Sequence, residues 1–346
     1  MDAYLTSLIA ELTYYEKAVG FDKLQTVYIG GGTPTVLATK QLDRLFSYLH
    51  SFIDFNKLTE VSVEANPESL NDACKVSCLK QNGVTRISLG VQSFNADHLK
   101  MLQRSHTEKD ICKVIAMLNK ENFEINVDMI YGIPSQSLKD WEQDLERLLR
   151  LPVTHISAYS LILEEHTKFH NEYAKDNLKL VDNEVEAQMF KLVIDKLVSA
   201  GFEHYEVSNF TKNKRSFHNM MYWKNEHYIG VGLGAHGHIN GSRYENTRGM
   251  PSYKKALELG ELPITNSHAL TDKEQIEESM FLGLRLMEGI DFDVLQAKYR
   301  VNIYELYQPK IDKLCNLGYV SLKSGVLRLT KKGLMMANDV FEEFLL

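Results

Sequence analysis

The chain has 346 residues, of which 44% are hydrophobic and 25% are charged, enough for one large core and a smaller domain. Its net charge of −7 argues against broad binding to a phosphate backbone, which needs clustered lysine and arginine, so we expect no nucleic-acid partner. A membrane span needs a run of about 18 apolar residues, and the sequence has none. Leu5, Leu8, Ile9 and Leu12 form one stripe of an opening helix without a basic flank. This pattern predicts a cytoplasmic protein and leaves open a peripheral place at a membrane.

Five short runs rich in β-branched and aromatic residues follow this helix, and helical patterns separate them. The runs cover residues 26–29, 60–64, 86–89, 125–130 and 155–159, and the helical patterns include 40–52 and 141–151. Strands that alternate with helices predict βα units and a parallel sheet. Because the chain opens with a helix, a barrel-like sheet would lack its first strand. The open edge would then favour self-association, and a homodimer is one form that it could take.

The second half of the chain predicts further parts. A long helix over 182–199 ends near Gly201, and a glycine-rich segment follows over 230–238. A later helix carries an apolar stripe that Gly289 closes, with its residues at Ile276, Met280, Leu284 and Met287. A hairpin around 323–325 and a final helix from Lys331 complete a mostly helical, winged-helix-like domain. We therefore predict a barrel core over 1–200, an extension over 201–270 and the C-terminal domain over 271–346.

The four cysteines predict no disulfide framework, because no export signal accompanies them. They are Cys74, Cys78, Cys112 and Cys315. Cys74 and Cys78 are four residues apart on a predicted helix and would share a face. A two-thiol metal site there is one interpretation, but we favour a structural role because no third ligand lies nearby in the sequence.

The most distinctive local feature is the glycine turn Gly30-Gly31-Gly32 at the end of the first predicted strand, followed by Thr33. Without Cβ atoms the backbone can bend freely and approach a ligand closely. A tight strand-to-helix turn explains the glycines equally well on spacing alone. The segment is no P-loop, since Gly-Lys-Ser/Thr does not follow, and it lacks the dinucleotide pattern Gly-x-Gly-x-x-Gly.

Polar residues follow or interrupt the neighbouring predicted strands. Glu64 and Gln92 lie at strand ends, and Asp128 interrupts an apolar strand. Ligands of parallel α/β sheets bind at the carboxyl ends of the strands, and a carboxylate on such a strand needs a partner. A satisfied core residue is the alternative for Asp128. The three side chains together favour a cofactor pocket, in which Glu64 could hold ribose hydroxyls and Arg104 a carboxylate.

Seven motifs in order carry a family resemblance: GGGTPT, EANPES, GVQSFN, LQRSHT, VDMIYGIP, ISAYSL and YEVSNF. The chain resembles the radical S-adenosylmethionine (radical SAM) proteins related to oxygen-independent coproporphyrinogen III oxidase. The resemblance implies an α/β fold, a radical SAM partial (βα)6 TIM-like barrel. It also implies that Gly31, Gly32 and Thr33 hold the methionine end of S-adenosylmethionine. The family's other contacts with this cofactor match four further positions, Glu64, Gln92, Arg104 and Asp128.

A second motif, His-Asn-x-x-Tyr-Trp, includes His218, Tyr222 and Trp223. It resembles the sequence that marks the HemW-type haem chaperones, and it implies haem binding through these three residues and delivery to respiratory membrane proteins. A neutral imidazole can ligate haem iron, and aromatic rings can pack on a porphyrin. A structural histidine beside an aromatic cluster is the alternative.

Radical SAM chemistry uses a [4Fe-4S] cluster on three cysteines, which in this family precede the GGGTPT motif. None of the 29 residues before Gly30 is cysteine, and we assign no catalytic residue and no cluster ligand. We expect either an N-terminally shortened chain or a cluster-less relative, without radical catalysis as written. Two other functions stay open, a coproporphyrinogen III dehydrogenase-type enzyme and a cluster-less protein that binds S-adenosylmethionine.

Overall fold

The computed structural model describes residues 1–163, 168–175 and 178–345. The chain divides into two compact units, which we describe in turn. The first unit comprises Met1–Thr26, Asp43–Thr59 and Ser216–Leu346, and the second comprises Val27–Leu42 and Glu60–Arg215. The domain boundaries at residues 200 and 270 were predicted from sequence patterns, whereas the two units are defined by contacts within the chain. The predicted boundaries stay a prediction.

The second unit contains a seven-stranded sheet in the order β1-β2-β3-β4-β5-β7-β6. Its strands are β1 (Thr26–Ile29), β2 (Glu60–Ala65), β3 (Arg86–Gln92), β4 (Glu124–Tyr131), β5 (His155–Ser160), β6 (Glu203–Glu206) and β7 (Asn209–Thr211). Strands β2 to β5 pair in parallel, whereas β7 pairs antiparallel with both β5 and β6. The five predicted strands and the parallel α/β sheet are confirmed. The antiparallel pair at the far edge was not predicted.

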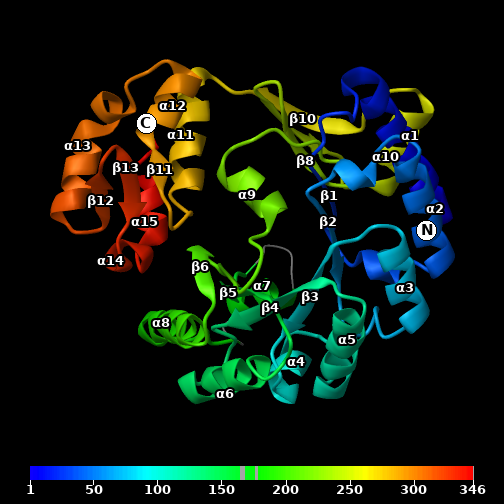
Figure 1. Cartoon of the computed structure of the whole chain (residues 1–346), viewed down its shortest axis with the longest axis horizontal. Helices are drawn as coiled ribbons and strands as arrows, with labels where there is room; N and C mark the ends of the chain where they lie inside the picture. Colours follow the sequence, from blue (N-terminus) through cyan, green and yellow to red (C-terminus); the bar gives the residue numbers. More distant parts are fainter. Residues whose placement is uncertain (164–167, 176–177, 346) are drawn as a thin grey trace. The chain divides into compact units, whose positions relative to one another are not determined.

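Helices alternate with these strands, and α3, α4, α5, α6 and α8 lie along the outside of the sheet (Figure 1). They are α3 (Ala73–Gln81), α4 (Ala96–Met101), α5 (Glu108–Lys120), α6 (Leu138–Leu148), α7 (Lys168–Ala174) and α8 (Asn183–Ser199). Capping boxes begin α5 and α6, where Thr107 and Ser137 exchange hydrogen bonds with the residue three positions on and so satisfy free backbone N–H groups. Apolar side chains of these helices, such as Ile111 of α5 and Trp141 of α6, are fully buried, and this burial holds α5 and α6 on the sheet.

The first unit combines helices with a three-stranded antiparallel sheet in the order β10-β9-β8. Its elements before residue 270 are α1 (Asp2–Val19), η2 (Phe55–Lys57), α9 (Phe217–Trp223), β8 (His236–Ile239), β9 (Ser242–Asn246), α10 (Met250–Glu258) and β10 (Ile264–Ala269). The segment η1 (Pro34–Val36) and the helix α2 (Thr39–His50) join the first two strands of the large sheet.

The buried face of α1 differs from the predicted apolar stripe. Leu5 is buried, but Leu8 and Leu12 are only half-buried, and Glu11 has no exposed surface at all. Glu11 tolerates this position because three donors reach its carboxylate: the Gly232 N–H, the Asn246 amide and the Tyr253 hydroxyl. A buried carboxylate with such partners can replace a leucine in a helix face.

The C-terminal part of this unit has the predicted winged-helix-like form, helices followed by a hairpin. It contains α11 (Asp272–Gly283), β11 (Ile290–Asp291), α12 (Phe292–Tyr299), α13 (Ile303–Asn316), β12 (Val320–Lys323), β13 (Val326–Leu329), α14 (Lys331–Leu334) and α15 (Ala337–Glu342). These elements share one apolar core that includes Met280, Ile303 and Leu327. The predicted hairpin around 323–325 is confirmed, with left-handed φ angles at Ser324 and Gly325.

Two helix ends in this part differ from the prediction. α11 ends at Gly283 instead of near Gly289, because the chain turns there and brings Ile290 against Gly283. A Cβ on Gly283 would lie 2.8 Å from Ile290 Cγ1. The predicted final helix from Lys331 is split into α14 and α15.

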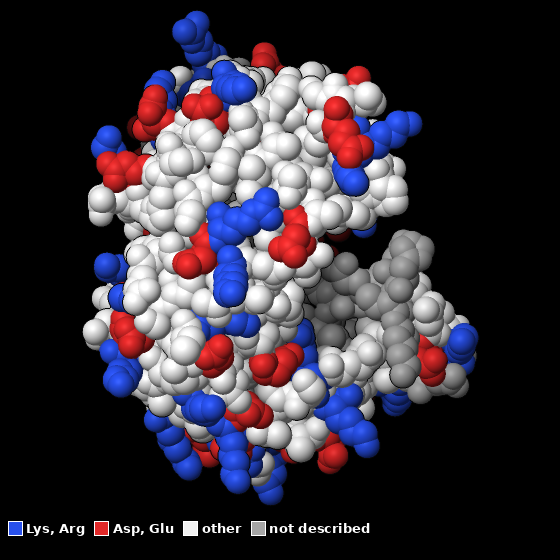
Figure 2. Space-filling view, turned by 90° about the vertical axis from the view of Figure 1, so that its right-hand side faces the viewer, with Lys and Arg blue, Asp and Glu red and all other residues white. Residues whose placement is uncertain are grey.

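The surface charge and the hydropathy of the helices agree with the composition of the chain. Basic and acidic side chains are interspersed over the face that Figure 2 shows, so this face carries mixed charge. Among the described helices, none is long and apolar enough to cross a membrane.

Candidate functional site

The glycine turn meets a carboxylate at the end of β1. The Tyr28 hydroxyl donates to Glu64 Oε1 at 2.7 Å, and the Gly31 N–H donates to Glu64 Oε2 at 3.1 Å. A Cβ on Gly30 would lie 2.5 Å from the Tyr28 ring and 2.6 Å from the Glu64 carboxylate. Gly31 has a φ of +80°, which favours glycine. The sequence therefore places glycine where the backbone must pass close to Glu64.

The next residues of the turn face open space on one side. A Cβ on Gly31 or Gly32 would have no described heavy atom within 4 Å, so a ligand can approach the backbone there. Thr33 is held in place by Asn66, whose amide donates to Thr33 Oγ1 at 2.9 Å. Gly31, Gly32 and Thr33, predicted together, form one continuous turn beside Glu64, in which the two glycines are exposed and Thr33 is half-buried.

Asp128 lies on β4 and is held by its neighbours on the same face of the sheet. Ser88 Oγ donates to Asp128 Oδ2 at 2.9 Å, and Asn126 Nδ2 donates to Asp128 Oδ1 at 2.7 Å. Burial raises the pKa of Asp128 above its ordinary value, against these hydrogen bonds. Burial also raises the pKa of Glu64, and the charge of Asp128 adds to that rise. The two predicted carboxylates therefore share one electrostatic environment.

Gln92 ends β3 at an irregularity in its pairing with β4. Its φ of +68° is unusual for a residue with a side chain, and the residue is buried. Gly90 makes room for two amides, since a Cβ there would lie 2.7 Å from Asn66 Oδ1 and 2.9 Å from Gln92 Nε2. The absence of a side chain at Gly90 thus leaves room for the amides of Gln92 and Asn66, and Asn66 in turn holds Thr33.

Arg104 is not joined to this group. It is half-buried in the loop after α4, where its N–H donates to the Leu99 carbonyl at 2.8 Å. Its guanidinium forms no hydrogen bond or ion pair with the residues that the structure describes.

Four residues that complete this site were not singled out from the sequence: Tyr28, Asn66, Ser88 and Asn126. A signal for two of them existed. Ser88 and Asn126 lie on the inner face of their strands, and Asn126 precedes Asp128 by two residues, the spacing that puts two strand side chains on one face. Polar residues at every second position of otherwise apolar strands predict a polar barrel interior.

The second candidate site lies on the short helix α9. His218 is half-buried, and both its ring nitrogens have a partner: Nδ1 lies 2.8 Å from Thr26 Oγ1, and Nε2 lies 2.9 Å from the Tyr222 hydroxyl. The His218 and Tyr222 rings meet edge to face, with centroids 4.8 Å apart, because residues four apart share one face of a helix. The structure thus brings these two predicted residues together.

Trp223, at the end of the same helix, contacts a cation instead of the histidine. The Arg285 guanidinium lies 4.4 Å from the centroid of the Trp223 ring, within the range of a cation–π interaction. The indole Nε1 is buried, and no described residue accepts a hydrogen bond from it. Met220 of this helix is buried in the core.

The cysteines form no cluster site among the described residues. Cys74 is exposed and Cys78 is buried, although both lie on α3. No group of three or more cysteine, histidine or acidic side chains in the described part of the chain could hold a metal ion. The cysteines present here therefore do not fit a [4Fe-4S] cluster, and we derive no step through one.

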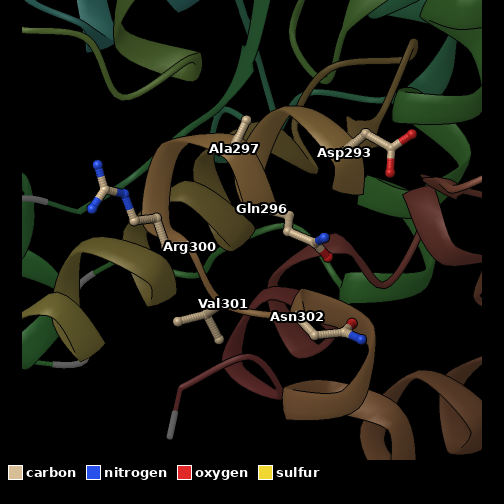
Figure 3. A pocket seen from close by; sticks show the side chains of 6 residues that line it. All are labelled: Asp293, Gln296, Ala297, Arg300, Val301 and Asn302. Carbon is tan, nitrogen blue, oxygen red and sulfur yellow. The ribbon is translucent and has the colours of Figure 1, made fainter.

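A surface hollow of about 470 Å³ lies between the end of α12 and the start of α13 (Figure 3). The residues that line it are Asp293, Gln296, Ala297, Arg300, Val301 and Asn302. None of them is a predicted site residue.

Comparison with known families matches two parts of the chain. Residues 7–148 match the model of the radical SAM superfamily, and residues 270–336 match that of the HemN C-terminal domain. The second match falls within the winged-helix-like part described above.

The chain is also similar to whole proteins. It is 40% identical to heme chaperone HemW of Lactococcus lactis, over 100% of this chain and 90% of the relative, and 37% identical to heme chaperone HemW of Bacillus subtilis, over 100% and 92%. Among solved structures, coproporphyrinogen III oxidase (HemN) from Escherichia coli, described as a radical SAM enzyme, superposes with a TM-score of 0.85. That match covers 99% of this chain and 83% of the other at 20% identity, which shows the fold.

Proposed function

Because this chain belongs to the HemW family of haem chaperones, we propose that it binds haem and passes it to haem-accepting proteins of the respiratory chain. The observation that carries this proposal is the His218 imidazole on α9, held between Thr26 and Tyr222. A hydrogen bond at one ring nitrogen fixes the tautomer and orientation of a histidine that ligates iron through the other.

The two partners of His218 distinguish its two ring nitrogens. The Tyr222 hydroxyl lies on Nε2 of His218, while Thr26 is on Nδ1. Haem iron would take the Nε2 position, so the Tyr222 hydroxyl must leave it as haem binds. Arg285, beside Trp223, supplies a permanent positive charge for a haem propionate.

The test is a haem titration of the purified chain followed by Soret absorbance. We expect saturable binding, and we expect His218→Ala to weaken it by about tenfold or more, which corresponds to about 1.4 kcal/mol. His227→Ala is the matched control, since His227 is an exposed histidine of the same unit. Tyr222→Phe should bind haem at least as tightly as the wild type, because it frees Nε2 and keeps the ring. Equal affinity of His218→Ala and the wild type would contradict the proposal.

We propose further that S-adenosylmethionine binds at the carboxyl edge of the sheet in the second unit. Three features support this: an exposed glycine backbone at Gly31 and Gly32, and the two carboxylates Glu64 and Asp128 beside it. Carboxylates accept hydrogen bonds from ribose hydroxyls, and backbone groups can bind the methionine end of the cofactor. When bound with a cluster, this cofactor supplies radical chemistry.

Isothermal titration with S-adenosylmethionine tests this second ligand. Asp128→Asn should lower the affinity about tenfold, because a charged acceptor becomes a neutral amide. Thr33→Ala should lower it less, since it removes one contact at the periphery of the site, and Arg104→Ala should leave it unchanged, since Arg104 is not joined to the site. Undiminished affinity in Asp128→Asn would remove this carboxylate from the site.

A further inference from the structure

A chain of hydrogen bonds leads from Asp128 into the barrel interior. Asn126 bridges Asp128 on its own strand to His155 on β5, where His155 Nδ1 lies 2.6 Å from Asn126 Oδ1. On its other side, His155 Nε2 lies 2.8 Å from the Tyr205 hydroxyl of β6. Asn126, His155 and Tyr205 are all buried, with exposed fractions of 6%, 1% and 1%, and hydrogen bonds in such a low-dielectric interior are stronger than in water.

The partners of Asn126 fix which way its amide points. Both hydrogens of Nδ2 are used, one toward Ser88 Oγ at 2.8 Å and one toward Asp128 Oδ1 at 2.7 Å. Oδ1 must then accept, and Ser157 Oγ lies 3.1 Å from it, although the single hydroxyl hydrogen of Ser157 also has Asn209 Oδ1 as an acceptor at 2.7 Å. Since Oδ1 cannot donate, His155 carries its proton on Nδ1, and its Nε2 accepts from Tyr205.

We propose that His155 and Asn126 are positioning residues for Asp128: His155 fixes the orientation of the Asn126 amide, and this amide holds the Asp128 carboxylate for its ligand. With the opposite amide orientation, Oδ1 of Asn126 would face the carboxylate, and two acceptors would meet. The Nδ1–H of His155 opposes that orientation because it needs Oδ1 as its acceptor. This inference rests on the proposed site for S-adenosylmethionine at Asp128.

The charged and titratable neighbours support a fixed tautomer. Burial lowers the pKa of His155 well below its ordinary value, and the charge of Arg86 on β3 adds to this, so the ring stays neutral. Arg86 itself is paired with Glu60 of β2, at 3.1 Å. A neutral ring with one proton, between a donor and an acceptor, has only one arrangement that satisfies both.

The groups that face Asp128 come from three further strands. Glu64 of β2, Tyr28 of β1 and Tyr159 of β5 all interact with its charge. None of these three changes when His155 is replaced, and the direct partners Ser88, Asn126 and Ser157 remain. A change in Asp128 on replacement of His155 therefore reports the orientation of the Asn126 amide.

The experiment uses the full chain labelled with carbon-13 at the aspartate carboxyl carbons, with Asp128→Asn to assign the signal. In His155→Leu the titration midpoint of Asp128 should rise above that of the wild type, by about 1 pH unit, because its N–H donor is no longer held in place. The affinity for S-adenosylmethionine should fall about tenfold at neutral pH. His155→Asn should restore both, since the asparagine amide nitrogen takes the place of Nδ1 as donor.

Two further variants keep the test decisive. Tyr205→Phe removes the hydroxyl that bonds to Nε2 of His155, so the tautomer of His155 is no longer fixed. The titration midpoint of Asp128 should then rise, by less than in His155→Leu. This variant replaces His155→Leu in the test if His155→Leu does not fold. His204→Leu is the matched control, because His204 is a half-buried histidine of the same strand β6 that bonds to the Val207 carbonyl instead. An unchanged Asp128 midpoint in His155→Leu and Tyr205→Phe would overturn the positioning role.

The two proposals fail in different ways. If the wild type does not bind S-adenosylmethionine but the Asp128 midpoint moves as expected, the ligand is wrong and the positioning role stands. If S-adenosylmethionine binds the wild type and every His155 variant equally, with unchanged midpoints, the ligand stands and the positioning role is overturned.

Discussion

Two glutamates, one in each compact unit, are held by the same kinds of partner. Glu64 accepts from the Tyr28 hydroxyl and the Gly31 N–H. Glu11 accepts from the Tyr253 hydroxyl and the Gly232 N–H. Burial is the largest cause of a raised pKa at both carboxyls. In each unit, therefore, a tyrosine and a glycine-rich turn hold one carboxylate.

The Glu11 and Glu64 clusters differ in how much open space lies beside the carboxylate. Glu11 has no exposed surface and gains a third donor, the Asn246 amide. Glu64 is half-buried, and the turn beside it has open space at Gly31 and Gly32. A carboxylate whose oxygens are fully used can only hold the fold together, whereas one with open space beside it can still bind a ligand. The type of hydrogen-bond partner therefore does not distinguish a structural carboxylate from one that can bind a ligand. The open space beside the carboxylate does.

The largest effect that we expect is on stability, at Glu11. Glu11→Ala leaves the Gly232 N–H, the Asn246 amide and the Tyr253 hydroxyl buried without their acceptor, and it should lower the free energy of unfolding by about 3 kcal/mol. Glu64→Ala should cost about 1 kcal/mol or less, because water can replace the lost acceptor. Urea unfolding followed by circular dichroism compares the two, with Lys17→Ala on the exposed side of α1 as control. Equal losses of stability in Glu11→Ala and Glu64→Ala would contradict the difference between the two clusters.

The pH dependence of the same variants sharpens this test. The pKa of Glu11 is raised in the folded state, so the folded protein holds its proton more tightly than the unfolded chain. The stability of the wild type then falls as pH rises from about 4.5 through the raised pKa. Glu11→Ala lacks this fall, and the gap between it and the wild type should narrow as pH rises.

At Glu64 the expected effect is on binding. Glu64→Gln should lower the affinity for S-adenosylmethionine about tenfold and change stability little. Because the pKa of Glu64 is raised, the ionised form, which accepts hydrogen bonds best, is gained as pH rises above about 4.5. The affinity of the wild type should therefore increase from about pH 5 to pH 8, and that of Glu64→Gln should increase less. Isothermal titration measures both, with Glu16→Gln on α1 as a control; a flat wild-type profile would contradict this role.

The sequence predicted much of the second unit because its signals are local. Short β-branched runs between helical patterns are enough to predict β1 to β5, and a turn of three glycines predicts a close approach of the backbone. Even there, the sequence did not single out Tyr28 as the partner of Glu64, since a tyrosine in a strand is ordinary core.

The Glu11 cluster could not be predicted for a physical reason. Its three donors lie between 221 and 242 residues further along the chain, and no spacing rule connects such distant residues. An isolated glutamate in an amphipathic helix is usually exposed, so periodicity favoured the leucines instead. On α9, by contrast, the pairing of His218 with Tyr222 follows from helical spacing, whereas the contact of His218 with Thr26, 192 residues away, does not.

The glycine turn allows a smaller test, in which one methyl group separates fold from binding. In Gly30→Ala the new Cβ would meet the Tyr28 ring and Glu64 at 2.5 and 2.6 Å, so we expect a loss of about 1–3 kcal/mol in stability. In Gly32→Ala the Cβ enters open space, and the free energy of unfolding should change by about 0.5 kcal/mol or less. The affinity for S-adenosylmethionine should still fall in Gly32→Ala. Urea unfolding and isothermal titration on both variants would show whether the open space belongs to a ligand.

The smallest expected effect comes from the same substitution in both clusters, Tyr28→Phe and Tyr253→Phe. Tyr253 has no exposed surface, and loss of its hydroxyl leaves Glu11 with one donor fewer, at a cost of about 1 kcal/mol in stability. Tyr28 is half-buried, so water can take the place of its hydroxyl, and stability should change by less than about 0.5 kcal/mol. The Tyr28 hydrogen bond lowers the pKa of Glu64, so Tyr28→Phe should shift the pH profile of S-adenosylmethionine binding toward higher pH. A larger stability loss for Tyr28→Phe than for Tyr253→Phe would mean that Glu64 also serves the architecture of its unit.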